Sequence, residues 1–252
     1  MDISVMIILF FASFIAALVD SIAGGGGLIL LPSLLLAGIP PQIALGTNKF
    51  AAFFGTSTAL INFIRNKKVI WQIGIIGIPF SIIGSIIGTK SILLFDNTTV
   101  AKIIVALLPL TALITLFPKK KIKNEITNFS KTNLYIHVPL ICTIIGFYDG
   151  FFGPGTGSFL IIFFYIILGM HLLKASAISK VFNLASNIGA FAVFAIAGKI
   201  LYSLGILIAI SNMLGGYVGS HLAIKKGEKV VKIFLLISFG ILFVTLATKY
   251  LF

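Results

Sequence analysis

Long apolar runs separated by short polar loops fill most of this chain. Most of the runs contain roughly 20 or more residues, which as helices rising about 1.5 Å per residue can cross a ~30 Å hydrocarbon core. They occupy residues 3–22, 43–64, 70–94, 98–117, 133–152, 175–197, 201–223 and 229–251. The pattern predicts an all-α polytopic membrane protein.

Two shorter apolar segments, 28–37 and 156–170, each follow a glycine-rich stretch. Such a stretch ends one helix and frees backbone N–H groups at the start of the next, where the helix dipole favours anions. We therefore predict two half-helices whose first amides bind a ligand, namely those of Gly26, Gly27, Gly155 and Thr156. Close packing between small residues is the alternative interpretation.

The sequence also repeats itself. At an offset of 131 residues Lys49 falls on Lys180, and the glycines at 84 and 88 fall on those at 215 and 219. Asp20 meets Asp149 at an offset of 129. We interpret residues 1–117 and 133–252 as two transmembrane repeats of about five helical segments each, joined by a basic linker at 118–132. The paired glycines, spaced four apart within apolar runs, predict close helix packing.

Basic residues concentrate in the loops at 65–68, 118–132 and 224–229. If both short segments count as passes, all three loops lie on one side of the membrane, which the positive-inside rule makes cytoplasmic. If the short segments are re-entrant, the third loop lies opposite the other two. The count favours ten segments with both termini outside, and five segments per repeat make the second repeat inverted. A helix of ten residues is only about 15 Å long, so the short segments must be buried in protein or line a cavity.

Composition excludes several classes of protein. Apolar residues make up 59% of the chain and charged residues 10%, which is too few for a soluble surface. The net charge of +13 belongs to the loops and not to a basic face for nucleic acid. The chain has one cysteine and three scattered histidines, so we expect neither a metal site nor a cofactor. No nucleophile has an evident histidine partner, and we expect no enzymatic activity.

Four charged residues lie within or at the edge of apolar runs: Asp20, Lys49, Asp149 and Lys180. A charge at the membrane centre costs about 2.5–3.5 kcal/mol, so each should face a partner or a cavity. Our functional hypothesis is that the lysines attract an anionic substrate and that the aspartates serve proton coupling or gating. The alternative is that two Asp–Lys pairs only hold broken helices together.

Polar neighbours accompany both lysines. Thr47 and Asn48 precede Lys49, and Ser179 and Asn183 flank Lys180. In an apolar run such residues either bond neighbouring helices or line a translocation pathway. We assign these four to substrate specificity.

Three stretches of the chain resemble a known family. They read DSIAGGGGL at 20–28, ALGTNK at 44–49 and GFYDGFFGPGTGS at 146–158. They are similar to the TauE/SafE family of sulfite-exporter-type permeases, especially its YfcA-like branch, and the likeness covers nearly the whole chain. The resemblance implies a multi-pass inner-membrane protein of bacteria or archaea that moves sulfite, sulfonates or other small organosulfur anions.

Together these observations predict a secondary transporter of a small anion in the cell membrane. Nothing in the chain resembles an ATP-binding domain, so a gradient should supply the energy. An anion channel and a structural membrane protein without transport are the alternatives. The expected partners are the anion and the lipid bilayer, with assembly into a homo-oligomer left open.

Overall fold

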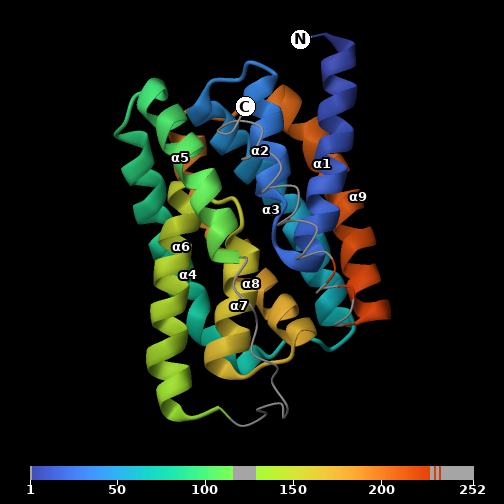
Figure 1. Ribbon diagram of the computed structural model, residues 1–252, viewed down its shortest axis with the longest axis vertical. Helices are drawn as coiled ribbons and strands as arrows, with labels where there is room; N and C mark the ends of the chain where they lie inside the picture. Colours follow the sequence, from blue (N-terminus) through green and yellow to red (C-terminus); the bar gives the residue numbers. More distant parts are fainter. Residues whose placement is uncertain (1, 116–128, 228–229, 231–232, 234–252) are drawn as a thin grey trace.

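The computed structural model describes residues 2–115, 129–227, 230 and 233, and all regular structure in this part is helical (Figure 1). The helices are α1 (Ile3–Ala23), α2 (Gly27–Leu36), α3 (Pro41–Arg65), α4 (Trp71–Leu93), α5 (Asn97–Thr115), η1 (Asn133–His137), α6 (Val138–Phe151), α7 (Thr156–Leu168), α8 (Leu172–Ile196) and α9 (Tyr202–Lys226). Each predicted run in the described part corresponds to one of them, with η1 and α6 continuous. The run predicted at 229–251 and most of the linker at 118–132 lie outside the described residues.

Five of these helical segments are long and apolar enough to cross a membrane: α1, α4, η1–α6, α8 and α9. The helices α2 and α7 contain 10 and 13 residues, or about 15 and 20 Å of helix, which is less than the ~30 Å hydrocarbon core. The prediction of an all-α polytopic membrane protein is confirmed.

The helices α3 and α8 form the centre of the bundle. They contact each other, while α9 packs on α3 and α4 packs on α8. In the most apolar 18-residue window of α8, 72% of the residues are buried, against 28% for α1. Large apolar side chains are exposed on the outer helices, for example Ile7, Ile75 and Ile206. Such a surface suits lipid, and it leaves α3 and α8 to hold the polar residues.

Glycines allow the outer helices to pack backbone against backbone. A Cβ on Gly88 of α4 would lie 2.0 Å from the carbonyl oxygen of Phe147 on α6, and one on Gly219 of α9 would lie 2.4 Å from that of Leu18 on α1. Gly84 and Gly215 make the same kind of contact one turn earlier. The prediction of close packing at these glycines is confirmed.

The packing of the outer helices also follows the internal repeat. Because α4 and α9 match at the offset of 131 residues, and α1 and α6 match at 129, the α4–α6 contact corresponds to the α9–α1 contact. In Figure 1, α1 runs down from the N-terminus, whereas η1 and α6 run up from the lower end. The turn between α3 and α4, the start of η1 and the end of α9 all lie in the lower part of this view, as the ten-segment topology requires. The inverted repeat over the whole chain stays a prediction, because the last segment of the second copy is outside the described residues.

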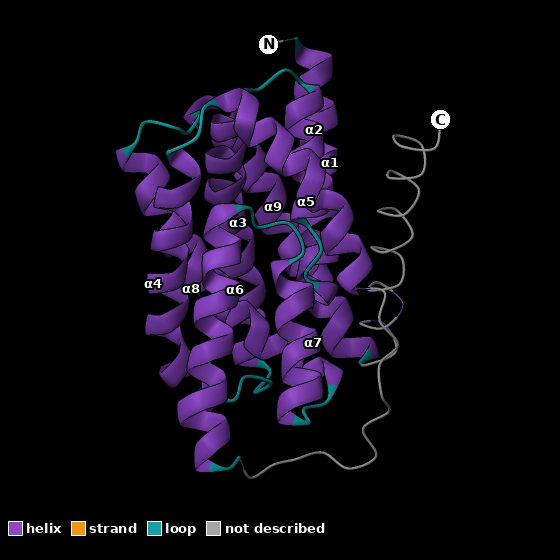
Figure 2. Ribbon diagram, turned by 60° about the vertical axis from the view of Figure 1, so that its left-hand side comes forward, coloured by secondary structure: helices purple, strands orange, loops and turns teal. Residues whose placement is uncertain are grey.

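The two helix breaks meet inside the bundle, where Figure 2 shows loop segments between helix ends. Gly24 ends α1 in the left-handed conformation with φ of 82°, and a Cβ on it would lie 2.1 Å from the carbonyl carbon of Gly157. A Cβ on Gly27, the first residue of α2, would lie 2.9 Å from Pro154 Cα. From this meeting point α2 lies in the upper half of the bundle and α7 in the lower half (Figure 1).

Candidate functional site

The end of α1 is fixed by hydroxyl groups from the second half of the chain. Ser176 of α8 donates to the carbonyl oxygen of Ile22 at 3.0 Å, and Ser158 of α7 donates to that of Ala23 at 2.7 Å. The last carbonyls of a helix have no partner within the helix, and the membrane interior supplies no water to satisfy them. These two serines therefore make the break in α1 tolerable at this depth.

The first ion pair joins α1 to α8. Lys180 Nζ lies 2.8 Å from Asp20 Oδ2, and it also donates to the main-chain oxygen of Asp20. The Lys180 side chain is fully buried, whereas 20% of the Asp20 side chain is exposed. The second oxygen, Asp20 Oδ1, accepts a long hydrogen bond of 3.4 Å from the amide of Gly26. Asp20 thus connects the end of α1, the start of α2 and the centre of α8.

The second ion pair joins α6 to α3. Lys49 Nζ lies 2.7 Å from Asp149 Oδ1, and both side chains are at least 97% buried. The hydroxyl of Thr156 donates to the same oxygen at 2.6 Å, and Ser186 donates to Oδ2 at 2.6 Å. Three donors therefore hold the Asp149 carboxylate. Gly153 leaves the space for the lysine, because a Cβ there would lie 2.8 Å from Lys49 Nζ.

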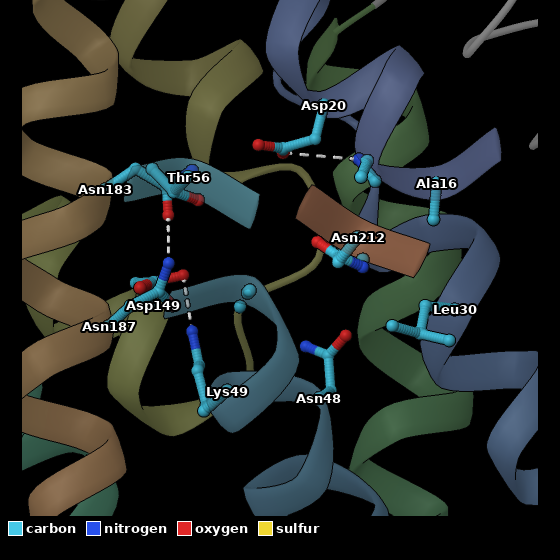
Figure 3. A pocket seen from close by; sticks show the side chains of 15 residues that line it. Ala16, Asp20, Leu30, Asn48, Lys49, Thr56, Asp149, Asn183, Asn187 and Asn212 are labelled. Atoms are coloured by element: carbon cyan, nitrogen blue, oxygen red, sulfur yellow. Dashed lines mark hydrogen bonds and ion pairs between the residues drawn. The ribbon is translucent and has the colours of Figure 1, made fainter. Parts of the chain in front are cut away.

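A small cavity of about 40 Å³ lies beside these pairs (Figure 3). On this measure a water molecule needs about 10–15 Å³, so the space suits a few waters or a ligand of few heavy atoms. Six helices (α1, α2, α3, α6, α8 and α9) and the loop after α6 line it, through Ala16, Ala17, Asp20, Gly26, Gly27, Leu30, Asn48, Lys49, Ala52, Thr56, Asp149, Gly153, Asn183, Asn187 and Asn212.

Amide and hydroxyl groups supply most of the polar lining. Asn187 donates to Asn183 Oδ1 at 2.9 Å, and Asn212 donates to Ser13 Oγ at 2.7 Å. The side chains of Asn48 and Thr56 are 94% and 96% buried, yet neither bonds any part of the chain that the structure describes. Figure 3 shows the amide of Asn48 directed toward the centre of the space. A buried amide without a protein partner is available to a ligand or to water.

The structure brings most of the sequence-predicted site residues together. The cavity is lined by Asp20, Gly26, Gly27, Asn48, Lys49, Asp149 and Asn183, and Lys180 lies directly behind Asp20. The other predicted residues do not line it.

Besides Lys180, four predicted site residues lie outside the cavity lining and make other contacts: Thr47, Ser179, Gly155 and Thr156. Thr47 Oγ1 accepts a hydrogen bond of 3.0 Å from the amide of Leu201, and the Ser179 hydroxyl donates one of 2.7 Å to the carbonyl oxygen of Ser176. The amide of Thr156 bonds Gly153, and Gly155 is the left-handed residue before α7 with φ of 84°. Gly155 and Thr156 form the start of α7, and Thr47 holds the residue before α9, whereas Ser179 bonds within α8.

Thr56 and Asn212 are polar lining residues that the sequence prediction did not include. Thr56 lies seven positions after Lys49 and so shares a face of α3 with it, a spacing from which it could have been found. Asn212 is a polar residue in a run otherwise assigned to lipid. Its position in the site depends on the packing of α9 against α1 and α3, which no local pattern indicates.

A model of the family described as "Sulfite exporter TauE/SafE" matches residues 9–246 of the chain. This protein belongs to the TauE/SafE family. Probable membrane transporter proteins are among its relatives. One from a Sinorhizobium species is 38% identical over 91% of this chain and 87% of its own length. One from Haemophilus influenzae is 37% identical over 92% of this chain and 91% of its own length. The probable membrane transporter protein YfcA of Escherichia coli K12 is 35% identical over 89% of this chain and 83% of its own length.

No solved structure matches the chain significantly. The family and the five candidate spans establish a multi-pass transporter of the inner membrane.

The site of this TauE/SafE protein is not simply positive. Lys49, Asp20 and Asp149 carry one positive and two negative charges in the lining, and Lys180 behind Asp20 balances the remaining charge. Each lysine is paired with an aspartate from the other half of the chain. An anion entering the cavity therefore competes with carboxylates that already hold both lysines.

Proposed function

We propose that this protein is a gradient-driven carrier of a small anion, and that the cavity at the helix breaks is its binding site. The observation that carries the proposal is the combination of Lys49, the unpartnered Asn48 amide and the first residues of α2 around one space inside the bundle. Substrate sites at broken helices between repeats are a common arrangement in secondary transporters.

The dimensions of the cavity favour a small substrate. About 40 Å³ has room for roughly three or four water-sized groups, which matches the heavy-atom count of an oxyanion such as sulfite. The description of the family model as a sulfite exporter supports a sulfur oxyanion or a short sulfonate.

The proposed binding groups come from both halves of the chain. Lys49 and Asn48 on α3 would donate to the anion from one side, and Asn183 on α8 would contact it from another. The amides of Gly26 and Gly27 at the start of α2 would add the positive end of a helix dipole. The matching residues on the α7 side, Ser179, Gly155 and Thr156, are proposed to act in the same way when that side is open.

The ion pairs favour a carrier over an anion channel. Lys49 and Asp149 belong to different repeats, and so do Lys180 and Asp20. Any motion of one repeat against the other must stretch or exchange these pairs, so they tie the position of the repeats to the occupancy of the cavity. In a channel that stays open, the pairs would have no such role.

Flux into proteoliposomes of the purified protein tests the proposal. Radiolabelled sulfite, thiosulfate, sulfate and methanesulfonate would be compared, and we expect saturable uptake of at least one. Replacing Lys49 by Gln removes a charged hydrogen bond worth about 1.5–3 kcal/mol, or roughly 10- to 150-fold in apparent affinity. Lys90→Gln, at the exposed end of α4, is the matched control and should transport like the wild type.

Lys49→Gln also leaves the buried Asp149 without its ion-pair partner. The double variant Lys49→Gln/Asp149→Asn keeps the pair neutral, and it should fold but not bind the anion. Unchanged uptake by this folded variant would refute the site, and no uptake of any anion by the wild type would refute the substrate class. Unitary conductance in a planar bilayer would identify a channel instead.

A further inference from the structure

Asp20 already occupies the positive groups that a substrate anion would use on the α1–α2 side of the cavity. One of its carboxylate oxygens lies 2.8 Å from Lys180 Nζ, and the other accepts the Gly26 amide at the start of α2. The side chain is 20% exposed and lines the cavity. An anion placed there would lie beside a like charge in an interior of low dielectric, where repulsion is strong.

We propose that Asp20 is the proton-binding site of the transporter, and that one proton travels on Asp20 with each substrate anion. The proposal rests on the anion carrier function proposed above. A proton on Asp20 removes the competing charge and releases the Gly26 amide, so the anion takes the place that the carboxylate held. The proton binds on the side where the anion enters and leaves on the side where the anion is released.

Lys180 keeps its position when Asp20 is neutral. Besides the carboxylate, Lys180 Nζ bonds the main-chain oxygen of Asp20, which cannot take up a proton at physiological pH. This carbonyl belongs to the last turn of α1, the negative end of the helix dipole, where a lysine is stabilised. Protonating Asp20 therefore leaves the positive charge of Lys180 fixed and uncompensated behind Asp20, next to the cavity.

The second aspartate is built differently. Asp149 is 2% exposed, and Lys49, Thr156 and Ser186 donate to its oxygens at 2.6–2.7 Å. A proton on this carboxyl group would weaken these short bonds, because each of them is strengthened by the negative charge of the carboxylate. We therefore assign Asp149 to the fixed frame of the site and Asp20 to the moving proton, although the two match in the repeat.

The charged surroundings of Asp20 are few. Among the described residues, Lys180 faces it from α8, and Lys49 and Asp149 share the cavity from α3 and α6. The start of α2 and the facing part of α9 contribute uncharged groups. In this proposal the two lysines and Asp149 stay charged throughout, so the charge of the cavity changes with the proton on Asp20.

Linkage gives the coupling a measurable form. If the anion binds the Asp20-protonated form, its half-saturation concentration should rise about tenfold per pH unit once Asp20 is ionised, the slope for one coupled proton. In Asp20→Asn, a neutral side chain of the same shape, this dependence should disappear. At each pH between 5.5 and 8, the half-saturation concentration of the wild type is divided by that of the variant. Protonation of the anion itself affects both proteins equally and therefore cancels in this ratio. Asp96→Asn, a carboxylate before α5 and far from the cavity, should keep the wild-type slope.

A second measurement needs no variant. Wild-type vesicles loaded with the dye pyranine, with the membrane potential clamped by valinomycin and potassium, should acidify inside as labelled sulfite or methanesulfonate enters. For methanesulfonate the ratio should be about one proton per anion. Entry of methanesulfonate without acidification would overturn the proposal, as would equal pH slopes for wild type and Asp20→Asn. In either case anion transport itself would stand. If the wild type takes up no anion at any pH, the carrier function and this inference both fail.

Discussion

Gly24→Ala should destabilise the protein more than any other single-methyl change at the helix breaks. The added Cβ would lie 2.1 Å from the carbonyl carbon of Gly157 and 2.2 Å from the amide nitrogen of Ser158, so the backbone of α1 or α7 must move. The φ of 82° adds about 1–2 kcal/mol for any residue with a Cβ. Overpacking of this kind costs about 1–3 kcal/mol more, which gives a loss of about 2–5 kcal/mol in the free energy of unfolding.

Two other glycines separate these contributions. Gly38 has a φ of 79° with nothing within 4 Å of an added Cβ, so Gly38→Ala carries the backbone term alone, about 1–2 kcal/mol. Gly74 lies within α4, where a Cβ would make ordinary contacts at 3.6 Å, so Gly74→Ala should be nearly neutral or slightly stabilising. The difference between Gly24→Ala and Gly38→Ala measures the contact between the two breaks.

The chain supplies its own probe of unfolding. Cys142 is its single cysteine and is fully buried in α6, so a thiol-reactive fluorophore reacts with it only when the bundle opens. Thermal midpoints in detergent should fall in the order Gly74→Ala, Gly38→Ala, Gly24→Ala, by roughly 2–4 °C per kcal/mol. Equal midpoints for Gly24→Ala and Gly38→Ala would refute the reasoning, because the close approach of the breaks would then contribute nothing.

Three further predictions follow from named contacts. Asn48→Ala should weaken substrate binding about 10- to 150-fold in the flux assay, since a hydrogen bond to a charged group is worth about 1.5–3 kcal/mol. It should leave the thermal midpoint unchanged because this amide bonds no described residue. Asp149→Asn should lower the free energy of unfolding by about 3–5 kcal/mol, because it leaves Lys49 buried without its ion-pair partner. A variant with the wild-type thermal midpoint in the thiol assay would contradict this. Hydrogen bonds from the amide and hydroxyl of Thr99 lower the pKa of Asp96 below 3.8. The ionised Asp96 therefore stabilises the start of α5 above pH 3.8. This stabilisation is lost as the pH falls through the lower pKa that Asp96 has in the folded state. The midpoint of Asp96→Ala should therefore lie below that of the wild type by a constant amount at neutral pH and approach it below about pH 4.

The helices were predictable because the chain marks them with apolar length and marks their ends with charge or glycine. Gly24 and Gly155 end or precede helices as left-handed residues, which is the role that the glycine clusters indicated. The matched positions of Asp20, Lys49, Asp149 and Lys180 predicted two pairs, and two pairs are present. The sequence did not reveal which aspartate belongs to which lysine, because that depends on the packing of α1 on α8 and of α6 on α3.

Thr156 marks the limit of local reasoning most clearly. As the first residue of α7 it was assigned an amide for the anion, and this assignment stays a prediction. In this structure its hydroxyl donates to the carboxylate of Asp149 and its amide closes a turn to Gly153. The corresponding residue on the other side, Gly27, has no side chain and lines the cavity. One hydroxyl therefore distinguishes the contacts of these two matching positions.

The packing of α1 on α9 determines when the bundle can close during synthesis. About 180 residues separate the end of α1 at residue 23 from the start of α9 at residue 202, so at 5–20 residues per second α1 waits roughly 10–40 s for its partner. During that time the carbonyls of Phe14 and Leu18 have no glycine backbone against them, and Ser13 lacks the Asn212 amide that bonds it. Helix α6, in contrast, begins at residue 138, about 45 residues after its partner α4 ends at residue 93. We therefore expect the second half of the chain to dock onto a first half that is already inserted, with the α9-facing side of α1 unpaired until α9 arrives.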